Sequence, residues 1–121
     1  MARFRLSHLA QADLAQILAT SGERWGGEGR RRYTTLLISA MRRVAADPET
    51  AVSRNRTDLV PGVRSFHIRH ASAGAAGQNV NRAVHILYYR SVRPGLIEII
   101  RVLHERMEPG RHLGAPSEDN A

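Results

Sequence analysis

The stretch RAVHILYYRSVRPGLIEIIRVLHERMEPGRHL, from Arg82 to Leu113, decides the fold of this chain. Polar and apolar residues alternate before Pro94-Gly95 and alternate again after it. Two alternating runs separated by a proline-glycine pair are typical of a β-hairpin. The second strand of this predicted hairpin leads into a charged, histidine-bearing tail, which we expect at the edge of a sheet and which consists of His104, Glu105, Arg106 and Met107.

Both predicted strands of this hairpin are apolar on two faces. In the first strand, alternation places Val84, Ile86 and Tyr88 on one face and Leu87 and Tyr89 on the other. In the second strand, it places Ile97, Ile99 and Leu103 on one face and Ile100 and Val102 on the other. A strand of this kind is either covered on both sides or keeps one face open for a partner.

The first half of the chain predicts a short strand, Arg3 to Leu6, followed by two amphipathic helices. The hydroxyl of Ser7 suits the cap of the first helix, and Gly26-Gly27 suits its end, because glycine readily adopts the left-handed exit conformation. The first helical stripe, with Trp25 expected in the core, comprises Leu14, Ile17, Leu18, Ser21 and Trp25. The second stripe ends before Asp47-Pro48 and comprises Tyr33, Leu36, Leu37, Ala40, Met41 and Val44.

The remaining segments complete a β-α-α-β-β-β order. Val63 to Arg69 is predicted as a strand after a turn at Pro61-Gly62, while Glu49 to Asp58 and the small-residue segment His70 to Asn81 are predicted as loops, the latter long and mobile. The predicted fold is therefore α/β (α+β), with a helical hairpin packed on one face of a small antiparallel sheet. The opposite face has no element left to cover it. Residues 1–113 would form the single domain, and residues 114–121 a disordered tail.

The composition favours a cytoplasmic protein with an acidic or anionic partner. A chain of 121 residues suffices for one core, and the absence of cysteine excludes disulfides and thiolate chemistry. We expect no membrane association, because no apolar run approaches the length of a span and the N-terminus lacks signal-peptide features. All 18 basic residues are arginine and the net charge is +7. Codon bias explains the missing lysine, but the sign of the charge still predicts an acidic partner.

Four motifs in their order resemble ParE-type toxins of the RelE/ParE toxin–antitoxin superfamily: LSHLAQADLAQI, ERWG, DLVPGVRSFHI and IEIIRVLHERMEPGRHL. The resemblance extends from Arg3 to Leu113, and the segment His70 to Asn81 departs from it, since family members mostly have a tight turn there. It implies a plasmid-stabilisation type toxin that inhibits DNA gyrase and is neutralised by a ParD-like antitoxin, with DNA met only through antitoxin or gyrase. RelE members instead cleave messenger RNA on the ribosome. A non-toxic descendant that only binds an antitoxin is a third alternative.

The ribonuclease alternative needs a base, a cation and an acid around the scissile phosphate. His104 with Arg64 and Arg101 is the candidate catalytic set, but a second acid is missing from the tail. His104 and Glu105 are also adjacent, so they face opposite sides of a regular strand. The alternative for His104 is a half-exposed strand-end histidine bonded to a neighbouring backbone or carboxylate group. We therefore predict no catalytic residues, no cofactor and no metal site.

Arginines beside apolar strands require a carboxylate or a phosphate to offset their desolvation. Pairing with Glu98 or Glu105 within the sheet is one possibility, and an acidic antitoxin segment or the gyrase target is the other. The open apolar face of the last strand would be the antitoxin dock. The predicted partner-binding residues are Arg64, Arg90, Ile100, Arg101, Val102, His104, Glu105, Arg106 and Met107.

Overall fold

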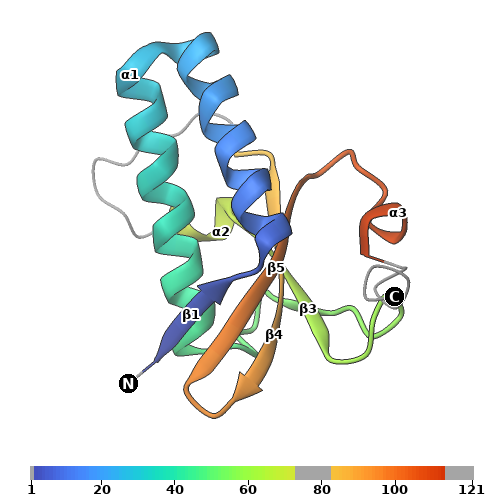
Figure 1. Cartoon of the computed structure of the whole chain (residues 1–121). Helices are drawn as coiled ribbons and strands as arrows, with labels where there is room; N and C mark the ends of the chain where they lie inside the picture. Colours follow the sequence, from blue (N-terminus) through green and yellow to red (C-terminus); the bar gives the residue numbers. More distant parts are fainter. Residues whose placement is uncertain (1, 73–82, 114–121) are drawn as a thin grey trace.

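The computed structural model describes residues 2–72 and 83–113, in which a helical hairpin packs on one face of a five-stranded sheet (Figure 1). The strands are β1 (Arg3–Leu6), β2 (Arg54–Asn55), β3 (Val63–His67), β4 (His85–Arg93) and β5 (Leu96–His104). The helices are α1 (His8–Ala46), α2 (Arg69–Ser72) and α3 (Pro109–Leu113). This arrangement confirms the predicted α/β fold with a helical hairpin on one side of the sheet.

Helix α1 contains both predicted helices, with Gly26 as the break between them. The Ser7 hydroxyl accepts the N–H of Ala10 at 3.0 Å and caps the first turn, as predicted. Gly26 has φ 73° and ψ −175°, a conformation that is essentially restricted to glycine. Helical geometry resumes directly after it, so residues 8–25 form a first arm and residues 27–46 a second arm of one hairpin.

The sheet has the order β1-β5-β4-β3-β2 and is mixed. The prediction of a wholly antiparallel sheet is wrong at β1, which pairs with β5 in parallel, with Arg3 opposite Leu96 and Leu6 opposite Ile99. The helical hairpin separates β1 from every later strand, so no tight turn forces an antiparallel pairing. The segment predicted as a patternless loop also contains β2, which pairs with β3 over only two residues.

A bulge in β5 changes the predicted faces of its last residues. Tyr88 stands opposite Arg101 and Tyr89 opposite Ile99, so Ile100 is an extra residue in β5. The β5 side chains in the helix-side core are therefore Ile97, Ile99 and Val102, whereas Leu103 packs on the other face. The predicted faces are wrong for Val102 and Leu103, because strict alternation does not continue through a bulge. The predicted faces of Tyr88 and Tyr89 in β4 are confirmed.

Side chains around the start of α1 satisfy the backbone of this bulge. The Ser7 hydroxyl donates to the carbonyl of Ile100 at 2.8 Å. The Asp13 carboxylate accepts the backbone N–H of Val102 at 2.9 Å. Backbone groups that a bulge removes from the ladder cost free energy if they remain buried without a partner. The helical hairpin therefore stabilises the irregular strand on which it packs.

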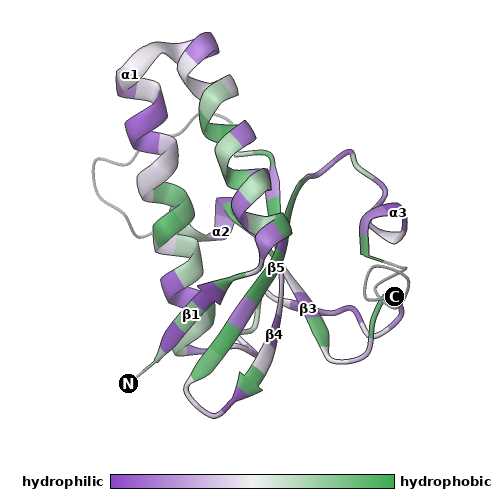
Figure 2. Cartoon of the chain, in the orientation of Figure 1, coloured by the Kyte–Doolittle hydropathy of each residue, from purple (hydrophilic) through white to green (hydrophobic). Residues whose placement is uncertain are grey.

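The main core lies between the hairpin and the sheet, and Figure 2 shows β5 largely hydrophobic where α1 crosses it. The predicted stripe of the second arm is buried there, and it comprises Tyr33, Leu36, Leu37, Ala40, Met41 and Val44. The expectation that Trp25 is a core residue is wrong, since its side chain is 48% exposed. Trp25 directly precedes the break at Gly26, and the tip of the hairpin extends beyond the sheet (Figure 1).

The opposite face of the sheet is partly covered, which corrects the prediction that no element would reach it. Leu113 of α3 is buried against Tyr88 and Leu103. Leu59 and Val60, in the loop before β3, pack on the same cluster. A groove of about 520 Å³ remains beside this cluster, and Ile100 lies in its floor. The predicted open face is therefore reduced to this groove.

Two predictions concern segments outside the described residues. His70 belongs to α2, so the predicted loop begins with a helical turn, while the rest of it beyond Ser72 lies outside the described residues. The predicted disordered tail, 114–121, lies wholly outside them. Among the described helices, none has the length and apolar character that crossing a membrane requires.

Candidate functional site

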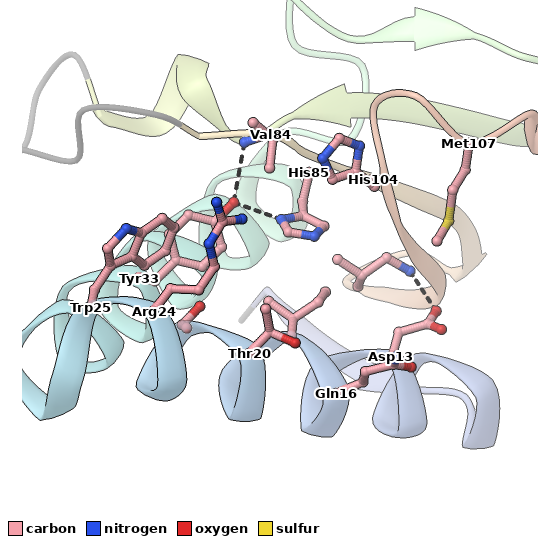
Figure 3. Close-up of a pocket in the computed structure, with 13 residues that line it drawn as sticks. Asp13, Gln16, Thr20, Arg24, Trp25, Tyr33, Val84, His85, His104 and Met107 are labelled. Atoms are coloured by element: carbon pink, nitrogen blue, oxygen red, sulfur yellow. Dashed lines mark hydrogen bonds between the residues drawn. The ribbon is translucent and has the colours of Figure 1, made fainter.

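A cleft of about 230 Å³ separates the first arm of α1 from the ends of β4 and β5, and we call it the histidine cleft. One face of the helix lines it through residues at three- and four-residue spacing, namely Asp13, Gln16, Ile17, Thr20, Ser21 and Arg24. Its remaining lining comprises Trp25, Tyr33, Val84, His85, Val102, His104 and Met107. Figure 3 shows Arg24, Trp25 and Tyr33 at one end, Met107 at the other, and both histidines between them.

Hydrogen bonds fix the protonation of His85. The hydroxyl of Tyr33 accepts the backbone N–H of Val84 at 3.2 Å, so its own proton is available for Nδ1 of His85, which lies 2.6 Å away. Nδ1 therefore acts as the acceptor, and the neutral ring carries its proton on Nε2. Within residues 2–72 and 83–113, this Nε2–H donates to no protein acceptor.

His104 has the same arrangement. Its Nδ1 accepts the backbone N–H of Arg106 at 3.0 Å, which leaves Nε2 to carry the proton of the neutral ring. Its ring meets the ring of His85 edge to face, with centroids 5.6 Å apart. The ring is half-buried. The alternative of a half-exposed strand-end histidine is therefore confirmed for His104, and of the two predicted kinds of partner, backbone or carboxylate, the structure shows backbone.

A third histidine, His67, has both of its ring nitrogens in hydrogen bonds within the chain. Nδ1 of His67 accepts the backbone N–H of Arg69 at 3.2 Å, and its Nε2 lies 2.7 Å from the carboxylate of Glu105. The bond from His67 holds the pKa of Glu105 below its usual range. Glu105 thus pairs with a histidine of β3 within the chain, whereas the sequence predicted it as a partner-binding residue. Neither cleft histidine has such a carboxylate in the described part of the chain.

Burial shapes the electrostatics of the cleft. It lowers the pKa of His85 from 6.5 to about 4, with His104 and His67 adding to the effect and Glu105 and Asp13 opposing it. Burial also raises the pKa of Tyr33. His85 is therefore neutral at pH 7. Both cleft histidines present N–H donors rather than a free nitrogen, an arrangement suited to binding an anion and unsuited to abstracting a proton.

An exposed aromatic side chain and a cation close one end of the cleft. The guanidinium of Arg24 lies 5.9 Å from the ring centroid of Trp25, and the Trp25 ring packs at 5.9 Å from that of Tyr33. Gly29 permits this position, because a Cβ there would lie 2.3 Å from Cβ of Trp25. The ERWGGEG sequence therefore places a large apolar surface beside a cation.

Hydrogen bonds within the chain hold the side chain of Arg101, which stabilises the fold. Its guanidinium donates to both carboxylate oxygens of Asp13 at 2.8 and 2.9 Å, and also to the carbonyl of His112 at 3.2 Å. The predicted partner within the sheet, Glu98 or Glu105, is wrong for Arg101, because Asp13 of α1 takes that place. The side chains of Arg101 and Asp13 are mostly buried, so each offsets the desolvation of the other.

The other predicted arginines lie elsewhere. Arg64 donates to the Ser53 hydroxyl at 2.8 and 3.1 Å in a separate recess near Tyr89. Arg90 pairs with Glu98 at 3.0 Å, which confirms the sheet pairing that the sequence left open. Arg106 is exposed.

Of the predicted set, the structure therefore brings Val102, His104 and Met107 into the histidine cleft. Met107 is 46% exposed at its rim, whereas Val102 is buried in its floor. Sequence reasoning missed Tyr33 and His85, because Tyr33 sits in an apolar helical stripe and His85 in an alternating strand. Their partnership spans 52 residues and has no local signal. The one indication of this cleft in the sequence is the set of polar residues on one helix face, such as Thr20 and Arg24.

Comparisons with known proteins agree on one family. Residues 4–109 match the family described as ParE toxin of the type II toxin–antitoxin system, parDE. Toxin ParE1 of Mycobacterium tuberculosis (strain H37Rv) is 35% identical over 111 residues, covering 92% of this chain and 97% of the relative. Toxin ParE1 of Caulobacter vibrioides is 35% identical over 115 residues, covering 94% and 100%. A solved structure, "Chromosomal ParDE TA system from P. aeruginosa", shares the fold with a TM-score of 0.61 at 19% identity, covering 86% of this chain and 96% of that one. This chain belongs to the ParE toxin family of type II toxin–antitoxin systems.

Proposed function

We propose that this chain inhibits DNA gyrase by binding, without chemical catalysis, and that a ParD-like antitoxin neutralises it in the cytoplasm. Membership of the ParE family supports the toxin role. We propose inhibition without catalysis because the three candidate catalytic residues line three different pockets. His104 lines the histidine cleft, Arg64 lines the recess near Tyr89, and Arg101 lines the groove on the opposite side of the sheet.

The chemistry of each candidate supports the same proposal. Phosphodiester cleavage requires a base and a cation within hydrogen-bond reach of one phosphate. The guanidinium of Arg101 is bonded to Asp13, and that of Arg64 to Ser53. His104 presents a protonated nitrogen in its neutral form, and its other nitrogen accepts a backbone N–H. Recruiting these groups for catalysis would require breaking contacts that stabilise the fold.

The surface supports a protein partner. Trp25 and Met107 are exposed large apolar side chains at the rim of one cleft, and Leu9 is exposed beside the groove on the other face. Exposed aromatic and methionine side chains next to a cation are typical of protein interfaces. With a net charge of +7, an acidic partner is favoured. An antitoxin that reaches both faces would bury these side chains.

Induced expression in bacterial cells tests the target. We expect loss of DNA supercoiling with intact messenger RNA, and rescue when the protein encoded by the adjoining reading frame is expressed together with the chain. Cleaved transcripts with normal supercoiling would instead establish the ribonuclease alternative. If neither changes while the antitoxin still binds, the chain is a non-toxic descendant and the gyrase proposal is wrong.

A further inference from the structure

Among the three histidines that lie in described strands, His67, His85 and His104, the two cleft histidines have an Nε2–H without an acceptor in the described residues. These three strand histidines all use Nδ1 as an acceptor, but only the Nε2–H of His67 meets a carboxylate, that of Glu105. His85 and His104 line one cleft with their rings in edge-to-face contact. A ligand that supplies an oxyanion there would complete the pattern that Glu105 completes for His67.

We propose that the histidine cleft receives a carboxylate side chain of the antitoxin, bound by the Nε2–H groups of His85 and His104. This inference rests on the proposed function, since it names the chemistry by which the partner is recognised at one site. It assigns these two residues as the binding pair. Arg24, also in the cleft, supplies the long-range attraction.

The cleft favours a carboxylate on a peptide over a phosphate group. Arg24 is its single cation with no carboxylate paired to it in the described residues, and a doubly charged phosphate would normally be met by several cations. The lining is otherwise rich in apolar side chains, among them Ile17, Val84 and Val102. An acidic side chain flanked by apolar residues matches this mixture.

The rim indicates a ligand larger than the cleft itself. The exposed side chains of Trp25 and Met107 flank the two ends of the cleft and extend the apolar surface beyond it (Figure 3). A free small acid would fill the centre and leave both uncovered. A peptide segment covers them while its carboxylate reaches the histidines. The carboxylate of Asp13 does not oppose this, because Arg101 neutralises it at 2.8 Å.

The test measures binding of the antitoxin encoded beside this chain to purified wild-type and variant proteins by titration calorimetry. His104→Ala and His85→Ala should each weaken binding by roughly 10-fold or more, the usual loss for a hydrogen bond to a charged group. His104→Gln and His85→Gln keep an N–H near the position of Nε2 and should stay within roughly 5-fold of wild type. His67→Gln is the matched control, because the donor of His67 is already used internally, and it should leave binding unchanged.

Replacing each Asp and Glu of the antitoxin by its amide then identifies the bound carboxylate. One such change should weaken binding as much as His104→Ala and cause little further loss when the two are combined. Thermal unfolding verifies each fold. If His85→Ala unfolds, the comparison of His104→Ala with His104→Gln decides, because the one hydrogen bond of the His104 side chain within the described residues lies in its own turn.

Three results would overturn the inference. Tight binding by His104→Ala would show that its N–H meets no carboxylate. Equal losses for alanine and glutamine would show a loss of packing instead of a donor. A failure of wild-type protein to bind this antitoxin at all would reject neutralisation itself, and with it the proposed function, whereas the first two results would leave that function standing.

Discussion

Acidification should destabilise this protein through His85. The ring is neutral in the fold, because burial lowers its pKa from 6.5 to about 4. Between these two values the unfolded chain binds more protons than the folded chain, so the free energy of unfolding falls as the pH falls through this window. Well above pH 6.5 both states carry a neutral ring, and the contribution of His85 is constant.

The magnitude follows from the two pKa values. Lowering the pH from 7 to 5 with a pKa of 6.5 in the unfolded chain and about 4 in the fold removes about 2 kcal/mol. The ring is only partly buried, and solvent screens the charges of His104 and Glu105 around it. We therefore expect about 1 kcal/mol, which corresponds to a fall of roughly 4 °C in Tm.

Urea unfolding at several pH values, followed by circular dichroism, measures this effect. The matched variant is His85→Asn, whose amide oxygen can still accept the proton of Tyr33 but does not titrate. Other groups titrate equally in both proteins, so the difference between the two pH profiles isolates His85. The wild type should lose more stability than the variant between pH 6.5 and pH 4.5. Parallel profiles would show that the ring is not held neutral, and would refute the tautomer assigned to it.

Three further predictions concern the fold. Gly26→Ala should cost roughly 1–3 kcal/mol in urea unfolding, because φ is 73° there; Gly27→Ala, with no atom within 4 Å of the added Cβ, is the control and should not destabilise. Asp13→Ala should cost roughly 3–5 kcal/mol, since it strands both the guanidinium of Arg101 and a bulge N–H; a loss below about 1 kcal/mol would contradict that role. Leu113→Ala should cost roughly 2 kcal/mol if α3 covers the sheet as described, and an unchanged Tm would show that it does not.

The parts of the fold that could be predicted are those with a local cause. Helical periodicity and Gly26 specify the hairpin of α1, and Pro94-Gly95 specifies the turn between β4 and β5. The bulge at Ile100 could not be predicted in this way. It depends on Ser7 and Asp13, which lie about ninety positions away in the sequence and satisfy its backbone groups. Predicted faces therefore fail after the bulge and succeed before it.

The same distinction applies to the candidate site. The sequence predicted His104 and Met107 as partner-binding residues because a charged strand end is visible in it, and both residues line the cleft. The partner of His104 in the cleft, His85, could not be identified, since a histidine in an alternating strand gives no indication of what it faces. The decisive contact is the one between Tyr33 and His85, where a core tyrosine sets the tautomer of a ring in the cleft.

The distribution of paired and unpaired charge connects the excess of arginine to the cleft. On the sheet, Arg90 and Arg5 share the carboxylate of Glu98, which offsets one of their two positive charges. At the tip of the hairpin, which is mostly hydrophilic in Figure 2, Arg24 and Arg30 have no ion pair within the described residues. The tip therefore carries positive charge that no carboxylate of the described residues pairs with. An acidic segment would be drawn toward this end of the molecule, where the histidine cleft offers the nearest unsatisfied donors.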